Sequence, residues 1–118
     1  MKIYFKSSIF TQDSLTANEV YLTYPPIMIS CAICGDQIGF VLKNFDKYSF
    51  NKTSHLTRED DLKITKFAEK HEKKLAEYPV NSFIDYYCPI CKTPIRIYFQ
   101  AWAGGRFTHG YVVHYIIE

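Results

Sequence analysis

The chain has 118 residues, 47% of them hydrophobic, and it carries 14 Lys and Arg against 12 Asp and Glu. This composition predicts one folded domain spanning residues 1–118 and excludes an intrinsically disordered chain. No stretch approaches the roughly 20 apolar residues of a membrane-spanning helix. Lys2 and Lys6 interrupt any hydrophobic secretory signal, so we expect a cytosolic protein.

The N-terminal half predicts strands and loops. Residues 1–24 alternate loosely around a polar stretch, which predicts two strands joined by a loop. The runs 27–31 and 38–45 flank Cys34-Gly35-Asp36 and predict a hairpin with cysteines at its tip. From Lys43 to Arg58 the chain is polar and basic, which predicts a loop.

A single helix is predicted from Arg58 to about residue 78. Thr57 precedes three acidic residues, an arrangement typical of a helix N-cap followed by a first turn that suits the helix dipole. Pro79 ends the pattern. Apolar positions recur at spacings of three and four, so one face of the helix is expected to join the core: Ile64, Phe67, Ala68, His71, Leu75 and Tyr78.

The last forty residues predict three strands, at 82–88, 94–102 and 110–117. Alternation places four side chains of the second strand on one face: Ile95, Ile97, Phe99 and Ala101. The last strand is apolar on both faces and is expected to be central or covered, with Tyr111, Val113, Tyr115 and Ile117 sharing a side. The predicted fold class is therefore α+β, an antiparallel sheet with a four-cysteine knuckle pair and one inserted helix.

Two Cys-x-x-Cys motifs are the most informative feature of the sequence. They are Cys31-Ala32-Ile33-Cys34 and Cys88-Pro89-Ile90-Cys91, each at the tip of a predicted strand-turn-strand. Four thiolates satisfy tetrahedral Zn²⁺ and leave no open position, so we expect one structural zinc ion. A thiol redox centre is the main alternative, but neither pair precedes a helix that would activate a thiol. An iron centre and four free thiols stay open as well.

The two motifs resemble the knuckles of the zinc-ribbon class, in Cys31-x-x-Cys34-Gly35 and Cys88-Pro89-x-Cys91. The resemblance covers about ten residues and implies a zinc site rather than an activity, because zinc ribbons serve transcription, translation and protein assembly. A long segment containing the helix separates the two motifs here. Tying its ends together constrains the unfolded chain by an amount equivalent to about 4 kcal/mol.

No catalytic motif accompanies the cysteines, and we expect a protein without enzymatic activity. His71 and His114 lie on predicted core faces, where satisfied core histidines are expected, while His55 lies in the polar loop. His109 is more suggestive, because it shares a glycine-flanked connection with Arg106 and Phe107, close to Trp102. This connection is either a ligand-binding loop or a solvated turn.

Protein binding is the preferred function. Aromatic residues make up 17% of the chain, and rings anchor protein interfaces. The overall type is similar to bacterial immunity proteins, small aromatic-rich α+β proteins that neutralise a toxin domain. This resemblance implies an inhibitory protein partner in a bacterial cytoplasm. The expected contact residues are Trp102, Arg106, Phe107, His109, Lys47 and Tyr48.

Nucleic-acid binding is the alternative. The basic loop interleaves Lys43, Lys47, Lys52 and Arg58 with three rings, a pattern that suits phosphates and stacked bases. A solvated loop whose rings pack inward is the simpler interpretation of the same segment. A four-thiolate zinc centre carries a formal charge of −2, which cancels the +2 of the chain and removes the global electrostatic argument for nucleic acid.

Overall fold

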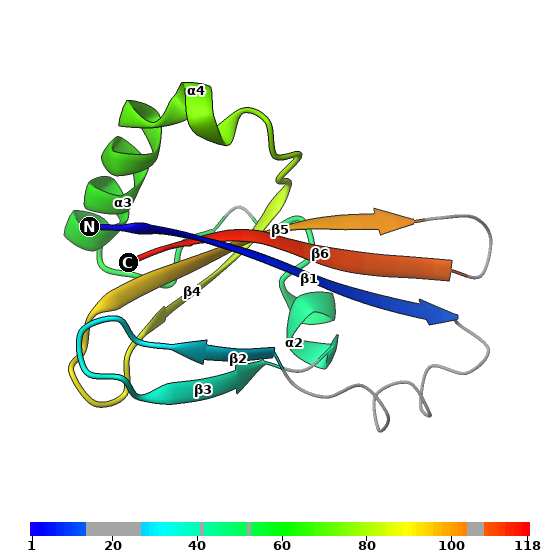
Figure 1. Cartoon of the computed structure of the whole chain (residues 1–118), viewed down its shortest axis with the longest axis horizontal. Coiled ribbons are helices and arrows are strands. Elements are labelled where there is room, and N and C mark those ends of the chain that lie inside the picture. Colours follow the sequence, from blue (N-terminus) through cyan, green and yellow to red (C-terminus); the bar gives the residue numbers. More distant parts are fainter. Residues whose placement is uncertain (14–26, 41, 52, 104–107) are drawn as a thin grey trace.

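A four-stranded antiparallel sheet forms the centre of the protein (Figure 1). The computed structural model describes residues 1–13, 27–40, 42–51, 53–103 and 108–118. The strand order is β1-β6-β5-β4, with β1 at Ile3–Asp13, β4 at Ser82–Tyr87, β5 at Pro94–Ala103 and β6 at Thr108–Ile117. The three C-terminal strands are therefore confirmed, and β6 occupies the central position expected from its two apolar faces.

Further elements cover both faces of this sheet (Figure 1). A two-stranded sheet, β2 (Ile27–Ser30) and β3 (Gln37–Phe40), lies with helix α2 (Leu42–Lys47) on one face. Helices α3 (Arg58–Lys70) and α4 (Glu72–Leu75) lie on the other. The result is the expected α+β class with antiparallel sheets. In the described part of the chain every helix is too short and too polar to cross a membrane.

Each face of the sheet has its own hydrophobic core. The larger core contains the alternating β5 side chains predicted to share a face, packed against the β2–β3 hairpin and against Phe45 of α2. Phe45 has no exposed surface and meets Phe99 edge to face, with ring centroids 5.1 Å apart. The smaller core lies beneath the helices and contains Ile64, Leu75, Tyr115 and Ile117.

An irregularity at His114 changes which face of β6 each residue occupies. Tyr98 of β5 pairs with Tyr115, but the next residue, Phe99, pairs with Val113, so β6 contains one extra residue at this point. Val113 and Ile116 consequently join the larger core, while Tyr115 and Ile117 join the smaller one. The prediction that Tyr111, Val113, Tyr115 and Ile117 share one side was wrong, because strict alternation stops at the bulge.

The segments before and after the hairpin differ from the sequence prediction. The first predicted strand is confirmed as β1, whereas the second, around Leu22, lies outside the described residues. The strand predicted to reach residue 45 ends at Phe40, and a short helix, α2, follows within the predicted loop. A helix at this point turns Phe45 into the core, which a solvated loop would not do.

The predicted long helix is present in two pieces. Thr57 caps α3 as expected, since its side chain accepts a hydrogen bond from the backbone N–H of Asp60. The helix ends at Lys70, and α4 continues from Glu72. At His71 the backbone N–H donates to Ala68 three residues back, and the ring Nδ1 lies 2.9 Å from the carbonyl oxygen of Phe67. The backbone hydrogen bond spans three residues instead of the four of a regular α-helix, and it marks the break between α3 and α4.

A buried ionic network attaches α3 to the sheet. Arg96 of β5 makes two hydrogen bonds to Asp85 of β4, at 2.6 and 2.9 Å, and one to Asp61 of α3 at 2.6 Å. Ser54 donates to Asp85, and the guanidinium lies 4.4 Å from the centroid of the Phe83 ring. Burial alone would lower the pKa of Arg96, but the hydrogen bonds to Asp85 and Asp61 outweigh it and raise that pKa.

Removing one partner from this network should be costly. We expect Asp85→Ala to lower the free energy of unfolding by about 3–5 kcal/mol, because a buried guanidinium loses its bidentate partner. The matched control is Lys63→Ala, which breaks the exposed Lys63–Glu59 pair of α3 and should change stability by less than about 0.5 kcal/mol. Urea unfolding of both variants measures the difference, and equal effects would contradict the assigned role.

Candidate metal centre

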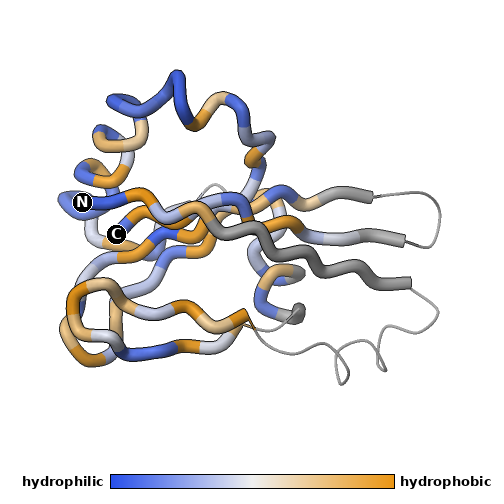
Figure 2. The backbone as a smooth tube through the Cα atoms, viewed as in Figure 1, coloured by the Kyte–Doolittle hydropathy of each residue, from blue (hydrophilic) through white to orange (hydrophobic). Residues whose placement is uncertain are grey.

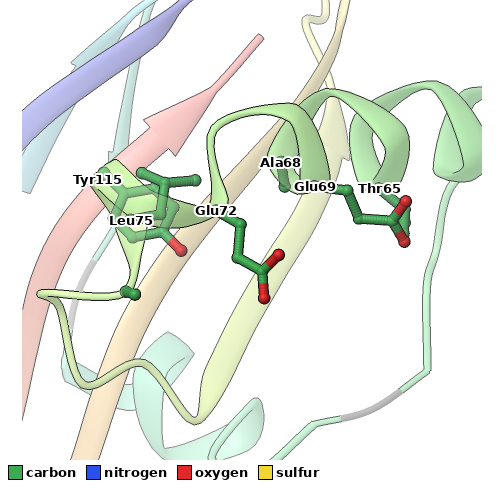
Figure 3. A pocket seen from close by; sticks show the side chains of 7 residues that line it. Thr65, Ala68, Glu69, Glu72, Leu75 and Tyr115 are labelled. Carbon is green, nitrogen blue, oxygen red and sulfur yellow. The ribbon is translucent and has the colours of Figure 1, made fainter.

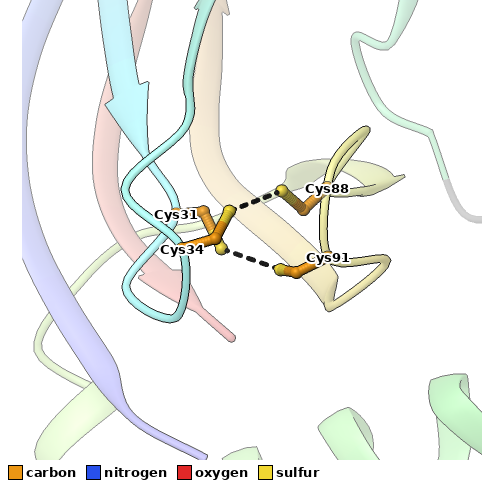
Figure 4. A group of neighbouring side chains, drawn as sticks. All are labelled: Cys31, Cys34, Cys88 and Cys91. Atoms are coloured by element: carbon orange, nitrogen blue, oxygen red, sulfur yellow. Dashed lines mark hydrogen bonds between the residues drawn. The ribbon is translucent and has the colours of Figure 1, made fainter.

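Four cysteine sulfur atoms meet where the β2–β3 hairpin approaches the loop between β4 and β5 (Figure 4). All four lie within 4.8 Å of one another. The Sγ atoms of Cys31 and Cys91 are 3.4 Å apart, and those of Cys34 and Cys88 are 3.5 Å apart. Each of these short distances is between a cysteine of one motif and a cysteine of the other, so the two motifs form a single cluster.

The two motifs have the same backbone geometry. We call residues 31–36 the first knuckle and residues 88–93 the second knuckle. In the first, the N–H of Cys31 donates to the carbonyl of Asp36 and the N–H of Gly35 donates to that of Cys31, both at 2.8 Å. In the second, Cys88 donates to Thr93 and Lys92 donates to Cys88, both at 2.9 Å. Each turn therefore points two thiols toward the same side.

Both knuckles use a residue with a positive φ angle directly after the second cysteine. Gly35 has φ 77°, as its position in the sequence predicted, and glycine adopts this conformation without strain. The equivalent residue of the second knuckle is Lys92, with φ 63°. Sequence reasoning missed this position, because only a glycine or asparagine would have marked it. The Lys92 ammonium donates to the carbonyl of Pro89 at 3.0 Å, which closes the turn.

The spacing of the sulfur atoms suits one tetrahedral ion. Four Zn–S bonds of about 2.3 Å place the sulfur atoms about 3.8 Å apart, close to the separations in this cluster. A disulfide would require about 2.05 Å, and all four cysteines are free. Cys31 and Cys88 are buried while Cys34 is exposed, so the centre lies at the surface with its inner half covered. The four cysteines can hold one metal ion.

The thiols differ in how readily they ionise. The pKa of Cys91 is lowered to about 6, first by the side-chain hydrogen bond with Thr93, whose Oγ1 lies 3.1 Å from Sγ, and then by the backbone N–H of Thr93. Burial raises the pKa of Cys31. Metal ligation requires thiolates, so a thiol with a lowered pKa such as Cys91 gives up its proton to a metal ion most readily at neutral pH.

Glu118 adjoins the first knuckle and had not been identified from the sequence. Its Oε1 accepts a hydrogen bond from the backbone N–H of Ala32 at 3.1 Å, which holds the turn between the two cysteines. Only 9% of Glu118 is exposed, and burial raises the pKa of its side chain. Nothing in the sequence marked it, because β6 reaches the first knuckle only through the fold.

The predicted partner-binding residues are only partly described. Arg106 and Phe107 lie outside the described residues, as do the side chains of Trp102 and His109, whose backbones belong to β5 and β6. Of the loop pair, Lys47 is exposed and Tyr48 is half-buried, with the Lys47 ammonium 5.4 Å from the ring centroid of Tyr48. Their roles in binding stay predictions.

Three histidines have described side chains, and each has its own surroundings. His71 is satisfied by the Phe67 carbonyl, and the exposed His55 ring packs edge-on to Tyr48. His114 differs from the expectation of a satisfied core histidine, because its buried Nε2 has no partner in the described part of the chain. Burial lowers the pKa of His114 and favours the neutral ring at the bulge.

An open groove runs between the helices and the sheet (Figure 3). Leu75, Ala68 and Tyr115 contribute apolar surface, while the carboxylates of Glu69 and Glu72 are exposed at its rim. Its volume is about 680 Å³, and its buried lining side chains, Leu75 and Tyr115, offer a ligand one hydroxyl, fewer convergent polar groups than the four cysteine sulfur atoms. The four-cysteine cluster is therefore the chemically better-defined site.

Comparison with known proteins adds no relative. No family model, no curated protein and no solved structure matches this chain. The fold and the cluster therefore define the class, an α+β protein with a zinc-ribbon-like four-cysteine centre, on their own geometry.

Metal removal should disrupt cooperative unfolding. A strong chelator, or Cys88→Ser, is expected to lower the melting temperature and broaden or abolish the transition, because the metal–sulfur bonds that would join the two knuckles are lost. Ile90→Ser is the matched control, since it changes an exposed side chain of the same turn and should retain one ion per chain. Elemental analysis and thermal melting measure both effects. An unchanged melting curve in strong chelator would rule out a structural metal.

The two positive-φ positions should respond in opposite directions. Gly35→Ala should cost about 1–2 kcal/mol of stability by backbone strain alone, because an added Cβ meets no atom within 4 Å. Lys92→Gly should relieve the same strain and raise the free energy of unfolding by up to about 1 kcal/mol, because greater chain entropy in the unfolded state and loss of the exposed hydrogen bond to Pro89 offset part of the gain. Urea unfolding of the metal-loaded variants tests the pair, and a stabilising Gly35→Ala would contradict the assigned geometry.

Proposed function

We propose that this chain is a non-catalytic, zinc-stabilised binding module that docks a protein partner through its two knuckles. The observation that carries the proposal is a matched pair of exposed isoleucines. Ile33 is 72% exposed and Ile90 is 67% exposed, and each precedes the second cysteine of its knuckle. Each knuckle of the cluster thus presents one large, exposed apolar side chain.

The surrounding surface supports this interpretation. Ala32 and Pro89, which follow the first cysteines, are also exposed, so each knuckle tip is apolar (Figure 2). Burying a large aliphatic side chain is worth about 1.5–3 kcal/mol. Because the tips are already ordered, a partner would gain this energy with little additional ordering cost.

Zinc is the proposed ion. Four thiolates in a tetrahedral arrangement suit Zn²⁺, which has no geometric preference of its own and accepts sulfur readily. A closed set of four ligands leaves no position for substrate or water, so the centre is structural. In a reducing cytosol, the compartment we propose, the thiols stay available as ligands.

A toxin domain is the more specific form of this partner. The resemblance to immunity proteins suggests it, and it rests on size, aromatic content and α+β class alone. The metal-centred tips give such an inhibitor a preformed apolar contact. This extension would fail separately from the general proposal if the captured partner were not a toxin.

Nucleic-acid binding receives less support from the basic loop. Phe45 is completely buried and Tyr48 packs against the larger core, so two of the three interleaved rings are not available for base stacking. Phe50 is 61% exposed and keeps this alternative testable. Binding of this kind should weaken steeply as salt is raised.

The deciding experiment compares affinity capture by two versions of the protein. The double substitution Ile33→Asp and Ile90→Asp should abolish capture of the specific partner from the native host, because two charges would have to be desolvated at the contact. Leu62→Asp is the control, since Leu62 is exposed on α3, away from the knuckles. Quantitative mass spectrometry and the 260/280 nm absorbance ratio of the eluates measure the outcome. A partner retained by the double variant, or nucleic acid in the eluate, would overturn the proposal.

A further inference from the structure

The groove between the helices and β6 lies on the face of the main sheet opposite the β2–β3 hairpin (Figure 1). Its volume of about 680 Å³ is within the range of ligand-binding pockets. Its walls are apolar at Leu75, Ala68 and Ala76, and the two small alanine side chains leave room between the helices and the strand. Because the groove opens to solvent, it can admit a segment of another polypeptide chain, which a closed cavity would exclude.

A buried tyrosine supplies the polar group at the floor of this groove. Only 6% of Tyr115 is exposed, and its ring stacks on Tyr98 with centroids 4.6 Å apart. Its hydroxyl oxygen points into the groove (Figure 3) and has no hydrogen-bond partner in the described part of the chain. Burial, followed by the neighbouring Tyr98, raises the pKa of Tyr115 to about 12, so the hydroxyl keeps its proton at neutral pH. A neutral hydroxyl can accept and donate hydrogen bonds, and a ligand that completes them gains affinity.

Two carboxylates make the rim of the groove negative. The side chain of Glu72 extends into the groove, and that of Glu69 lies farther along the helix, toward Thr65 (Figure 3). Both are exposed, and neither belongs to an ion pair in the described part of the chain. Lys70 and Lys73 adjoin them in sequence, but neither lysine lines the groove. Charge complementarity therefore favours an occupant with a positive charge.

The apolar walls select among cations. A metal ion would require several oxygen ligands around one point, and these walls provide hydrocarbon instead. A lysine ammonium is compact and strongly hydrated, whereas an arginine guanidinium is planar, more weakly hydrated and able to lie against apolar or aromatic surface. The guanidinium has five N–H donors, enough for a carboxylate and a hydroxyl at once. Its aliphatic stem can pack on Leu75 while the charged end meets Glu72.

We propose that this groove binds an arginine side chain of a protein partner, with the guanidinium between the Glu72 carboxylate and the Tyr115 hydroxyl. The aliphatic stem lies against Leu75, and apolar residues on either side of the arginine cover Ala68 and Ala76. The groove and the β2–β3 hairpin are on opposite faces of the main sheet, so this site is tested independently of docking at the knuckle tips.

The test is an NMR titration of the full, metal-loaded chain at pH 7 with three peptides. They are acetyl-leucyl-arginyl-leucinamide and its counterparts with citrulline or lysine in place of arginine. We expect saturable shifts of the Tyr115 and Ala68 signals with the arginine peptide. Binding of the citrulline peptide should be at least about ten-fold weaker, because citrulline has nearly the same shape without the charge. The lysine peptide should also bind more weakly than the arginine peptide.

The same titration distinguishes the other possible occupants. Propylguanidine that binds as tightly as the arginine peptide would assign the groove to a small ligand. Self-association of the unliganded protein that Glu72→Lys abolishes would assign it to a second copy of this chain. Either result would overturn the proposal, as would equal affinity for the three peptides or the absence of a saturable shift.

Two variants assign the interaction to its residues. Glu72→Gln keeps the shape of an exposed side chain and removes its charge, so affinity for the arginine peptide should fall at least about ten-fold. Tyr115→Phe keeps the ring that stacks on Tyr98 and removes only the hydroxyl, so affinity should fall at least about three-fold. Glu59→Gln is the matched control, because it removes an exposed carboxylate of the same helix outside the groove and should leave affinity unchanged. Thermal melting confirms that each variant is folded, and unchanged affinity in either Glu72→Gln or Tyr115→Phe would overturn the proposal.

Discussion

The connection between the two knuckles is the constraint on which the rest of the structure depends. The β2–β3 hairpin has four residues in each strand and forms a sheet of its own. A two-stranded hairpin is marginally stable alone. Its position is fixed by apolar packing against the main sheet and by the cysteines of the second knuckle. A metal ion bound at this point would link segments that are distant in sequence and hold the hairpin over one face of the main sheet.

The opposite face depends on a different kind of interaction. Arg96 links β5 to β4 and to α3 through three carboxylate hydrogen bonds, and it does so beside the smaller core. Ion pairs of this kind contribute little net stability compared with apolar packing, but a single geometry satisfies all of their groups. The hairpin is thus positioned by apolar packing and by a four-cysteine cluster that can hold a metal ion, and the helix by a guanidinium and carboxylates.

Features with a local sequence pattern could be predicted, and features that depend on tertiary contacts could not. The alternation in β5, the Thr57 cap and the spacing of the four cysteines each have a local physical cause, and each was found. The helix α2 was missed because six residues carry too little periodicity to separate a helix from a strand. The bulge at His114 carries no glycine or proline, so nothing local showed that β6 changes faces there. Lys92 and Glu118 were missed for a related reason, since their roles follow from backbone geometry and from the arrival of β6 at the first knuckle.

With a divalent ion bound, the cysteine end of the molecule would be locally negative although the chain has a net positive charge. The chain has a formal charge of +2, but four thiolates with one divalent ion carry −2 and Glu118 lies beside them. The tips of the two knuckles are nonetheless apolar, with Ile33 and Ile90 exposed at matched positions. A negative centre beneath an apolar surface would repel the phosphates of a nucleic-acid backbone, and this supports the proposal of a protein partner over nucleic acid.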